Sequence, residues 1–245
     1  MRNIKLTIEY DGANYSGWQR QANAVNTVQR EIERAIKKVT GGEATVHGSG
    51  RTDAGVHALG QVANFLTPSA MKTESIRKAL NSELPEDITV RRAQEVAEDF
   101  HSRISAKKKT YFYRILNRPS RPAVERKTCW FISEELDFGA MKEACRRIPG
   151  EHDFKAFCNT NITVRTTVRR VFSAKLARKG GFIVFSVEAN GFLKRMVRFL
   201  AGTLVRVGRG KLSPDGFERI LKTGRKTRDV IPAPPRGLFL EKVLY

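Results

Sequence analysis

The stretch GSGRTDAGVHA, residues 48–58, connects two segments that predict β-strands, 44–50 and 61–66. Small residues surround its charged centre, and glycines let a backbone approach a ligand closely in conformations closed to other residues. Asp53 can therefore be presented rigidly at a cleft, with Arg51 beside it favouring the charged form. A turn or a helix cap is the simpler interpretation of such an aspartate, and spacing alone slightly favours it. The stretch matches neither pattern typical of a phosphate-binding loop.

Strand and helix patterns extend outward from this stretch. Residues 3–10 alternate apolar and polar side chains, which predicts a strand. Thr27 is placed to cap a helix with an apolar face, and residues 73–81 predict a second helix. Residues 88–95 predict another strand. Strands and helices are mixed without strict β-α-β alternation, which favours an α+β fold.

The second half of the chain repeats this mixture. Residues 107–116 carry bulky side chains on both faces and predict a central strand. Residues 168–177 and 182–189 predict a hairpin. Apolar residues at helical spacing predict a long helix over 191–207.

A Pro-rich, basic stretch at 118–127 lies near the expected boundary between two halves of the chain. We divide the chain into an N-terminal α+β half, residues 1–105, which contains Asp53, and a C-terminal α+β half, residues 106–245. A chain of 245 residues gives each half room for a hydrophobic core.

The charge of the chain is its most unusual bulk property. Forty-five Lys and Arg residues face twenty-five Asp and Glu residues, for a net charge of +20. Such an excess repels itself in a compact protein, so it indicates a polyanionic partner, with nucleic acid favoured over a membrane surface. Apolar residues make up 40% and charged residues 29%, which is ordinary globular composition and argues against disorder.

The three cysteines, Cys129, Cys145 and Cys158, include no C-x-x-C pair, so neither a disulfide framework nor a structural zinc site is expected. The four histidines add no metal-ligand spacing. A reducing cytoplasm fits this cysteine usage. No apolar run is long enough for a transmembrane helix, and the alternating N-terminus does not predict a signal peptide.

The stretch FHSRISAKKKTYFYRI, residues 100–115, leads from basic residues into a strand with three aromatic side chains. Nine basic residues and one acidic residue lie between Arg103 and Lys127. Aromatic faces beside cations suit base stacking and phosphate contacts. The alternative is that Tyr111 and its neighbours are ordinary sheet residues.

The stretch NGFLKRMVRFLAGTLVRVGRGK, residues 190–211, contains Lys194, Arg195 and Arg198 off the apolar stripe of the predicted helix. These residues fit a basic face that lines an RNA groove or pairs with a carboxylate. A solvated helix face explains them equally well.

Five blocks, in this order, resemble the tRNA pseudouridine synthase A family over nearly the whole chain. They are YDG with GWQ near the start, GRTDAGVHA, FHSR-S-A with a K-x-Y-x-Y strand, NGFL--MVR, and APP-GL-L near the end. One departure is Tyr15, where family members often carry phenylalanine.

The resemblance implies roles that spacing cannot supply. The aspartate of GRTD is the family's catalytic nucleophile and corresponds to Asp53. The first tyrosine of the K-x-Y-x-Y strand, Tyr111, stacks on the target uracil and is a candidate for proton transfer. The arginine of MVR, Arg198, pairs with the catalytic carboxylate. Other basic residues of these blocks are expected to bind substrate: Arg51, Arg103, Lys109, Lys194 and Arg195.

The resemblance also implies the fold, the reaction and the partners. The expected fold is α+β, with two related halves that share a continuous mixed, mostly antiparallel sheet, helices packed on it and a central active cleft. The expected reaction is isomerisation of uridine at positions 38, 39 and 40 of the tRNA anticodon arm, with base flipping and with neither cofactor nor metal. The expected assembly is a homodimer that binds tRNA and no membrane.

Two other classes of protein deserve comparison with this isomerase. A non-catalytic RNA-binding protein fits the composition equally well, but it has no need for an aspartate within GRTDAG on a cationic surface. An RNA nuclease using Asp53 and a histidine is less well supported, because metal-dependent nucleases usually gather several carboxylates and no such cluster appears in the sequence.

Overall fold

The computed structural model describes residues 1–21, 26–159 and 164–245. Its internal contacts divide the chain into two compact units. The first unit comprises Met1–Lys107 together with Phe239–Tyr245, and the second comprises Lys108–Leu238. The C-terminal strand therefore belongs to the first unit, although along the chain it follows the last residue of the second unit.

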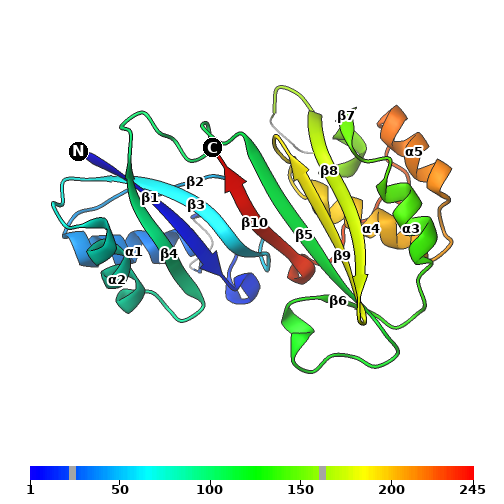
Figure 1. Ribbon diagram of the computed structural model, residues 1–245, viewed down its shortest axis with the longest axis horizontal. Helices are drawn as coiled ribbons and strands as arrows, with labels where there is room; N and C mark the ends of the chain where they lie inside the picture. The colour runs from blue at the N-terminus through cyan, green and yellow to red at the C-terminus, as the bar shows by residue number, and fades with distance from the viewer. Residues whose placement is uncertain (22–25, 160–163) are drawn as a thin grey trace. The chain divides into compact units, whose positions relative to one another are not determined.

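A sheet with the strand order β4-β1-β3-β10 forms the first unit, and β2 pairs with β3 at its side. Strands β3 and β10 are parallel, and the other pairs are antiparallel. Helices α1 and α2 lie on one face of this sheet (Figure 1). The elements are β1 (Arg2–Tyr10), η1 (Gly12–Asn14), α1 (Val28–Thr40), β2 (His47–Gly48), β3 (His57–Thr67), α2 (Thr73–Glu83), β4 (Ile88–Val96) and β10 (Leu238–Leu244).

The alternation predicted for the first strand describes β1 well. Ile4, Leu6 and Ile8 are fully buried, with intermediate side chains between them. Helix α1 begins after Thr27, but the Thr27 side chain makes no capping hydrogen bond, contrary to expectation. It ends at Thr40, and Gly41 caps it with a left-handed φ of +73° that suits glycine.

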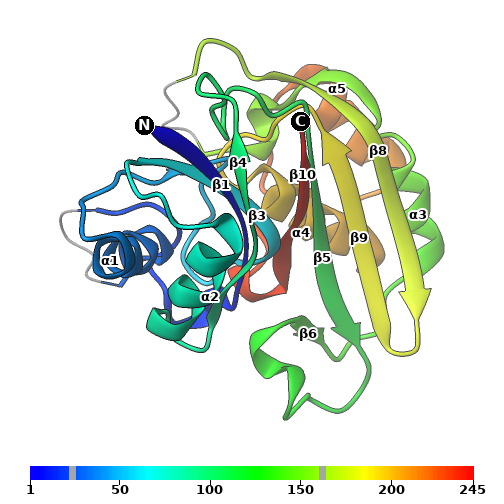
Figure 2. The same ribbon diagram turned by 60° about the vertical axis from the view of Figure 1, so that its left-hand side comes forward.

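The second unit has the strand order β5-β9-β8-β7, with β6 parallel to the end of β5 and the other pairs antiparallel. Helices α3, α4 and α5 cover one face of this sheet (Figure 2). The elements are β5 (Lys108–Asn117), η2 (Glu125–Lys127), β6 (Trp130–Ile132), α3 (Phe138–Cys145), β7 (Gly150–Asp153), η3 (Phe154–Phe157), β8 (Val168–Lys179), β9 (Phe182–Ala189), α4 (Met196–Gly208), α5 (Pro214–Thr223) and η4 (Pro235–Gly237).

Helix α4 is the most deeply buried helix of the second unit, since only Arg206 among its residues is not buried. Close packing explains this burial. A side chain at Gly202 would place its Cβ 2.0 Å from the carbonyl oxygen of Ile231, so only glycine lets the segment after α5 approach the helix. The Ala233 N–H donates to the Arg198 carbonyl oxygen at 2.9 Å and holds the two segments together.

The α+β class and the mixed, mostly antiparallel strand pairing are confirmed. Several boundaries differ from the predictions. Strand β3 begins at His57, four residues before the predicted segment 61–66. The strand predicted over 44–50 shrinks to β2, because the chain turns at Ser49, and the predicted helix over 191–207 begins only at Met196. The three cysteines are buried free thiols. In the described part of the chain, no helix is long and apolar enough to cross a membrane.

Candidate active site

The turn that contains Asp53 leads from β2 into β3. The Val56 N–H donates to the Asp53 carbonyl oxygen at 3.1 Å, and Gly55 adopts a left-handed φ of +75°. Thr52 is buried, Asp53 is half-buried and Ala54 is exposed. The aspartate thus lies in a turn closed by backbone atoms, at the boundary between the interior and the surface, where a carboxylate can meet a ligand.

A second loop, residues 11–19, packs directly against this turn. The Trp18 N–H donates to the Thr52 carbonyl oxygen at 3.1 Å, and the Gly55 N–H donates to the Tyr15 carbonyl oxygen at 3.3 Å. A Cβ at Gly17 would lie 2.6 Å from the Thr52 carbonyl oxygen. The YDG–GWQ block and the GRTDAGVHA block are therefore two halves of one assembly around Asp53.

His57 ties these loops together at the start of β3. Its Nδ1 accepts the Gly12 N–H at 3.1 Å and lies 2.9 Å from the Asp11 carboxylate. The imidazole ring stacks on Phe239 of β10, with ring centroids 4.6 Å apart. A Cβ at Gly12 would lie 1.9 Å from the Val56 carbonyl oxygen, so this close approach requires glycine.

Two side chains that sequence reasoning did not single out lie beneath the turn. The Tyr10 hydroxyl hydrogen-bonds Thr52 Oγ1 at 2.8 Å, and Gln61 on β3 hydrogen-bonds residues 49 and 50. Burial raises the pKa of the Tyr10 phenol well above its usual range, so Tyr10 stays neutral. The available signal for Gln61 was a glutamine within the mostly apolar segment 56–66.

The cations expected in the first unit differ in their placement. Arg51 is exposed on the Asp53 loop, and its Nε donates to Gln19 Oε1 at 3.1 Å. Arg103 is exposed in a separate turn, where its backbone N–H donates to His101 Nδ1 at 3.1 Å. The first unit therefore joins Arg51 to Asp53 in one loop and holds Arg103 on another.

Tyr111 lies on the helix-covered face of β5 in the second unit. It is 7% exposed, and its ring meets Phe192 edge-to-face with centroids 5.0 Å apart. Lys109 precedes it by two residues and so shares this face of the strand. This position is typical of an aromatic core residue. It also holds the Tyr111 ring rigidly, as stacking against a nucleobase would require.

Arg198 lies in the first turn of α4 and is only 8% exposed. Its Nε donates to the Ala233 carbonyl oxygen at 2.8 Å, while the Ala233 N–H donates back to the Arg198 carbonyl. A buried guanidinium held at Nε keeps its terminal nitrogens in a fixed orientation, which suits carboxylate pairing. The solvated-helix interpretation is therefore wrong for Arg198.

Lys194 and Arg195 precede α4, although the sequence pattern placed them on it. Arg195 is the N-cap residue, with a left-handed φ of +64° that helix geometry excludes, so the helix begins at Met196. Both side chains are exposed. They are available to solvent at the start of the helix that contains Arg198.

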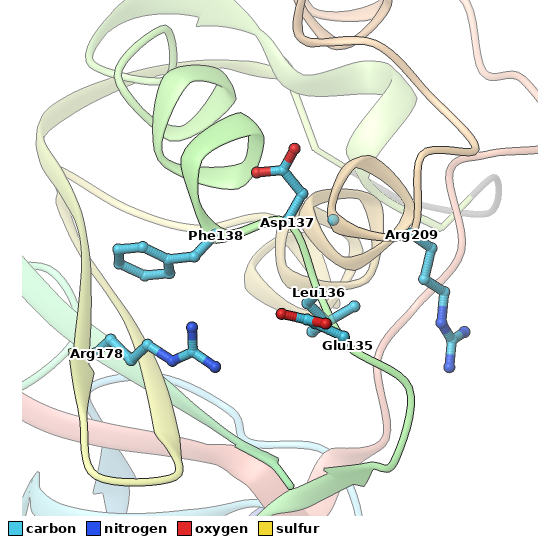
Figure 3. Close-up of a pocket in the computed structure, with 7 residues that line it drawn as sticks. Glu135, Leu136, Asp137, Phe138, Arg178 and Arg209 are labelled. Atoms are coloured by element: carbon cyan, nitrogen blue, oxygen red, sulfur yellow. The ribbon is translucent and has the colours of Figure 1, made fainter.

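A cavity of about 560 Å³ in the second unit contains none of the predicted site residues (Figure 3). Its two arginines and its acidic residues give it mixed charge. Arg209 pairs with Glu134 at 2.9 Å, and the Asp137 carboxylate caps α3 by accepting the Ala140 N–H. The lining residues are Glu135, Leu136, Asp137, Phe138, Arg178, Gly208 and Arg209.

Among residues 1–21, 26–159 and 164–245, no group of three His, Cys, Asp or Glu side chains is arranged to hold a metal ion. The class that the fold and the loop define is a strongly basic α+β protein with a half-buried carboxylate on a clamped turn. Such a carboxylate suits nucleophilic or acid–base chemistry on a polyanion.

Comparison with known proteins identifies a family within this class. The family described as tRNA pseudouridine synthase matches residues 6–104 and 144–245. The chain is 49% identical to tRNA pseudouridine synthase A 2 of Clostridium perfringens and 48% identical to tRNA pseudouridine synthase A of Caldicellulosiruptor bescii, each over 100% of both chains. It is 47% identical to the tRNA pseudouridine synthase A of Geobacter sp. strain M21, over 100% of this chain and 99% of the relative.

The chain belongs to the tRNA pseudouridine synthase family. It is an isomerase that acts on uridine in tRNA. This assignment favours the enzyme over the passive RNA-binding protein and over the nuclease.

Proposed function

We propose that this enzyme converts uridines 38, 39 and 40 of the tRNA anticodon arm to pseudouridine, with Asp53 as its catalytic carboxylate. The observation that supports this most directly is the clamped turn, in which loop 11–19 holds the backbone on both sides of a half-buried aspartate. A structural turn does not require such support, whereas a catalytic group must be held within a fraction of an ångström of its target.

Tyr111 and Arg198 complete the proposed catalytic set. A uridine within a stem must leave the stack before its glycosidic bond can be reached, at a cost of a few kcal/mol. Stacking on Tyr111 recovers part of that cost. Arg198 holds the charge of the catalytic carboxylate through its terminal nitrogens, since its Nε is bonded to Ala233.

The reaction conserves atoms and oxidation state. The bond between N1 and C1′ breaks, the base rotates, and C5 bonds to C1′ while its proton leaves and N1 regains one. No oxidant, reductant or group donor is needed, so we propose that the enzyme uses neither cofactor nor metal. Three first steps fit an ionised Asp53: attack on uracil C6, attack on ribose C1′, or removal of a sugar proton.

We further propose that the enzyme is a cytoplasmic homodimer in which one tRNA contacts both subunits. The net charge of +20 supports a large phosphate footprint. Sedimentation of the free enzyme tests the dimer, and a monomer at assay concentration would contradict it.

The decisive assay incubates the enzyme with unmodified tRNA without added metal or cofactor. Pseudouridine is then mapped by chemical derivatisation. We expect it at positions 38 to 40 in tRNAs that carry uridine there. Its absence from the anticodon arm would reject the proposed specificity.

Replacing Tyr111 with phenylalanine separates stacking from proton transfer. The ring remains, so KM should change little, but loss of a proton-transfer group typically lowers kcat by about 10²- to 10⁴-fold. Single-turnover kinetics on an anticodon stem-loop measure this step.

The matched control is Tyr113→Phe, on the same face of β5. It removes the hydrogen bond from the Tyr113 hydroxyl to the Pro234 carbonyl oxygen and should cost about 1 kcal/mol of stability with kcat retained. A Tyr111→Phe enzyme with wild-type kcat would leave Tyr111 with a stacking role only.

The cations of the proposed substrate-binding set should act on tRNA affinity. Binding should fall steeply with salt, and each phosphate contact removed should lower the slope of log K against log salt by about one. Neutralising Arg51, Arg103, Lys109, Lys194 or Arg195 in turn, with affinity measured across a salt series, identifies the phosphate contacts. An unchanged slope removes that residue from the interface.

A further inference from the structure

A buried polar network lies directly beneath the residues that precede Asp53. At its centre is Gln61, which is fully buried in β3 between neighbours that are themselves mostly buried and apolar. Transferring an amide into such surroundings is costly unless both of its ends are hydrogen-bonded. The partners of Gln61 therefore indicate why a glutamine stands here.

Both ends of the Gln61 amide bind the Asp53 loop. The Ser49 hydroxyl donates to Gln61 Oε1 at 2.7 Å, and Gln61 Nε2 donates to the Gly50 carbonyl oxygen at 2.8 Å. The Ser49 N–H donates to the Val62 carbonyl oxygen at 2.7 Å. Two consecutive loop residues are thus fixed against β3 through a donor and an acceptor on one uncharged side chain.

Tyr10 extends this network to the neighbour of Asp53. Its hydroxyl contacts the Gln61 side chain and also hydrogen-bonds Thr52 Oγ1 at 2.8 Å. Tyr10 is 3% exposed, so these bonds form away from water, where their geometry is strongly specified. Gln61 and Tyr10 together reach Ser49, Gly50 and Thr52.

We propose that Gln61, together with Tyr10, is a positioning residue that fixes residues 49–52 and thereby sets the orientation of the Asp53 carboxylate. This inference rests on the proposed function of Asp53. An apolar residue at position 61 would satisfy the hydrophobic surroundings but would release the loop. Displacing a catalytic group by about 1 Å can cost about a hundredfold in rate.

The test compares Gln61→Glu with Gln61→Met from about pH 5.5 to 8.5. The pKa of a buried glutamate can lie within this range. A protonated glutamic acid can still donate to Gly50 and accept from Ser49, whereas the carboxylate repels the Gly50 carbonyl. Burial raises the pKa of a carboxyl group. Gln61→Glu should therefore be most active at low pH and lose kcat as pH rises through that raised pKa. Gln61→Met should be slow throughout.

We expect kcat to fall by about ten- to a hundredfold for Gln61→Met, and for Gln61→Glu at high pH, with KM for tRNA nearly unchanged. Other titrating groups do not produce this profile. Burial raises the pKa of Tyr10 and of Tyr245, which contacts Ser49, so both remain neutral over this range. His47 and His57, at the two ends of the loop, are present in the wild type, whose profile supplies the baseline.

The matched control is Asn117→Asp in β5. Asn117 is also a buried amide, and its Nδ2 donates to the carbonyl oxygens of Ile132 and Glu134. This variant should lose stability without a new pH dependence of kcat. Tyr10→Phe provides a second test if the Gln61 variants do not fold, and it should lower kcat about tenfold with KM retained.

The outcomes separate the two proposals. If the wild type forms pseudouridine in the anticodon arm and folded Gln61→Glu equals its kcat at high pH, the positioning role is overturned and the proposed function stands. Wild-type kcat in Tyr10→Phe overturns it as well, should the Gln61 variants not fold. A wild-type enzyme without that product overturns the proposed function, and the positioning role with it.

Discussion

Asp53→Asn is expected to abolish pseudouridine formation while retaining tRNA binding. Asparagine keeps the size of the side chain and the turn, but it is neither a nucleophile nor a base under assay conditions. The substitution also removes one negative charge from a surface that binds phosphates, so tRNA affinity should be retained or slightly increased. Product mapping on anticodon stem-loops and equilibrium binding, performed on the same preparation, measure both effects.

A suitable control is Asp99→Asn, which makes the same chemical change at an exposed aspartate of the first unit. It should leave kcat within a fewfold of the wild type. Loss of both turnover and binding in Asp53→Asn, with a lowered melting temperature, would identify a structural aspartate. Turnover that survives would remove Asp53 from the mechanism.

The second large effect is expected at Arg198. Arg198→Met keeps much of the buried aliphatic volume but removes the charge and the bond from Nε to the Ala233 carbonyl oxygen. Loss of a preorganised electrostatic group typically lowers kcat by about 10²- to 10³-fold. The unpaired Ala233 carbonyl should also cost about 1–3 kcal/mol of stability. Single-turnover rates and thermal unfolding measure the two effects separately.

Arg206→Met is the matched control, because Arg206 lies on the same helix. Its Nη2 is 2.6 Å from the Asp229 carboxylate, and losing this pair should lower stability comparably. Only Arg198→Met should lower kcat on the folded enzyme. Equal kcat values for the two variants would make Arg198 a structural residue of the second unit.

Local patterns in the sequence predicted most of the secondary structure. The alternation of Ile4, Leu6 and Ile8 predicts β1 because a strand with one buried face must place apolar side chains at every second position. The 3.6-residue spacing after Thr27 predicts α1, because a helix with one buried face must place its apolar side chains at this spacing. The start of α4 could not be predicted this way. The apolar stripe includes Leu193, and it contains no sign that Arg195 adopts a left-handed conformation.

The candidate site depended on different information. The composition indicated a polyanionic partner, and the GRTDAGVHA block identified Asp53, although spacing alone favoured a turn. The support beneath the turn depends on the tertiary fold. The Tyr10 hydroxyl meets Thr52 because β1 pairs with β3, and Gln61 meets Ser49 and Gly50 because the turn folds back onto β3. A sequence shows which residue types occur, whereas hydrogen-bond partners depend on strand register.

The sequence by itself therefore determined the fold class, the basic character and the family, since these follow from periodicity, charge and motif order. Only the tertiary structure decided that loop 11–19 holds the turn that contains Asp53, and that the buried side-chain amide of Gln61 lies beneath this turn. It also decided that Arg198 is buried while Arg195 is exposed. The physical reason is that burial and hydrogen bonding depend on contacts between segments distant in the chain, which no local pattern encodes.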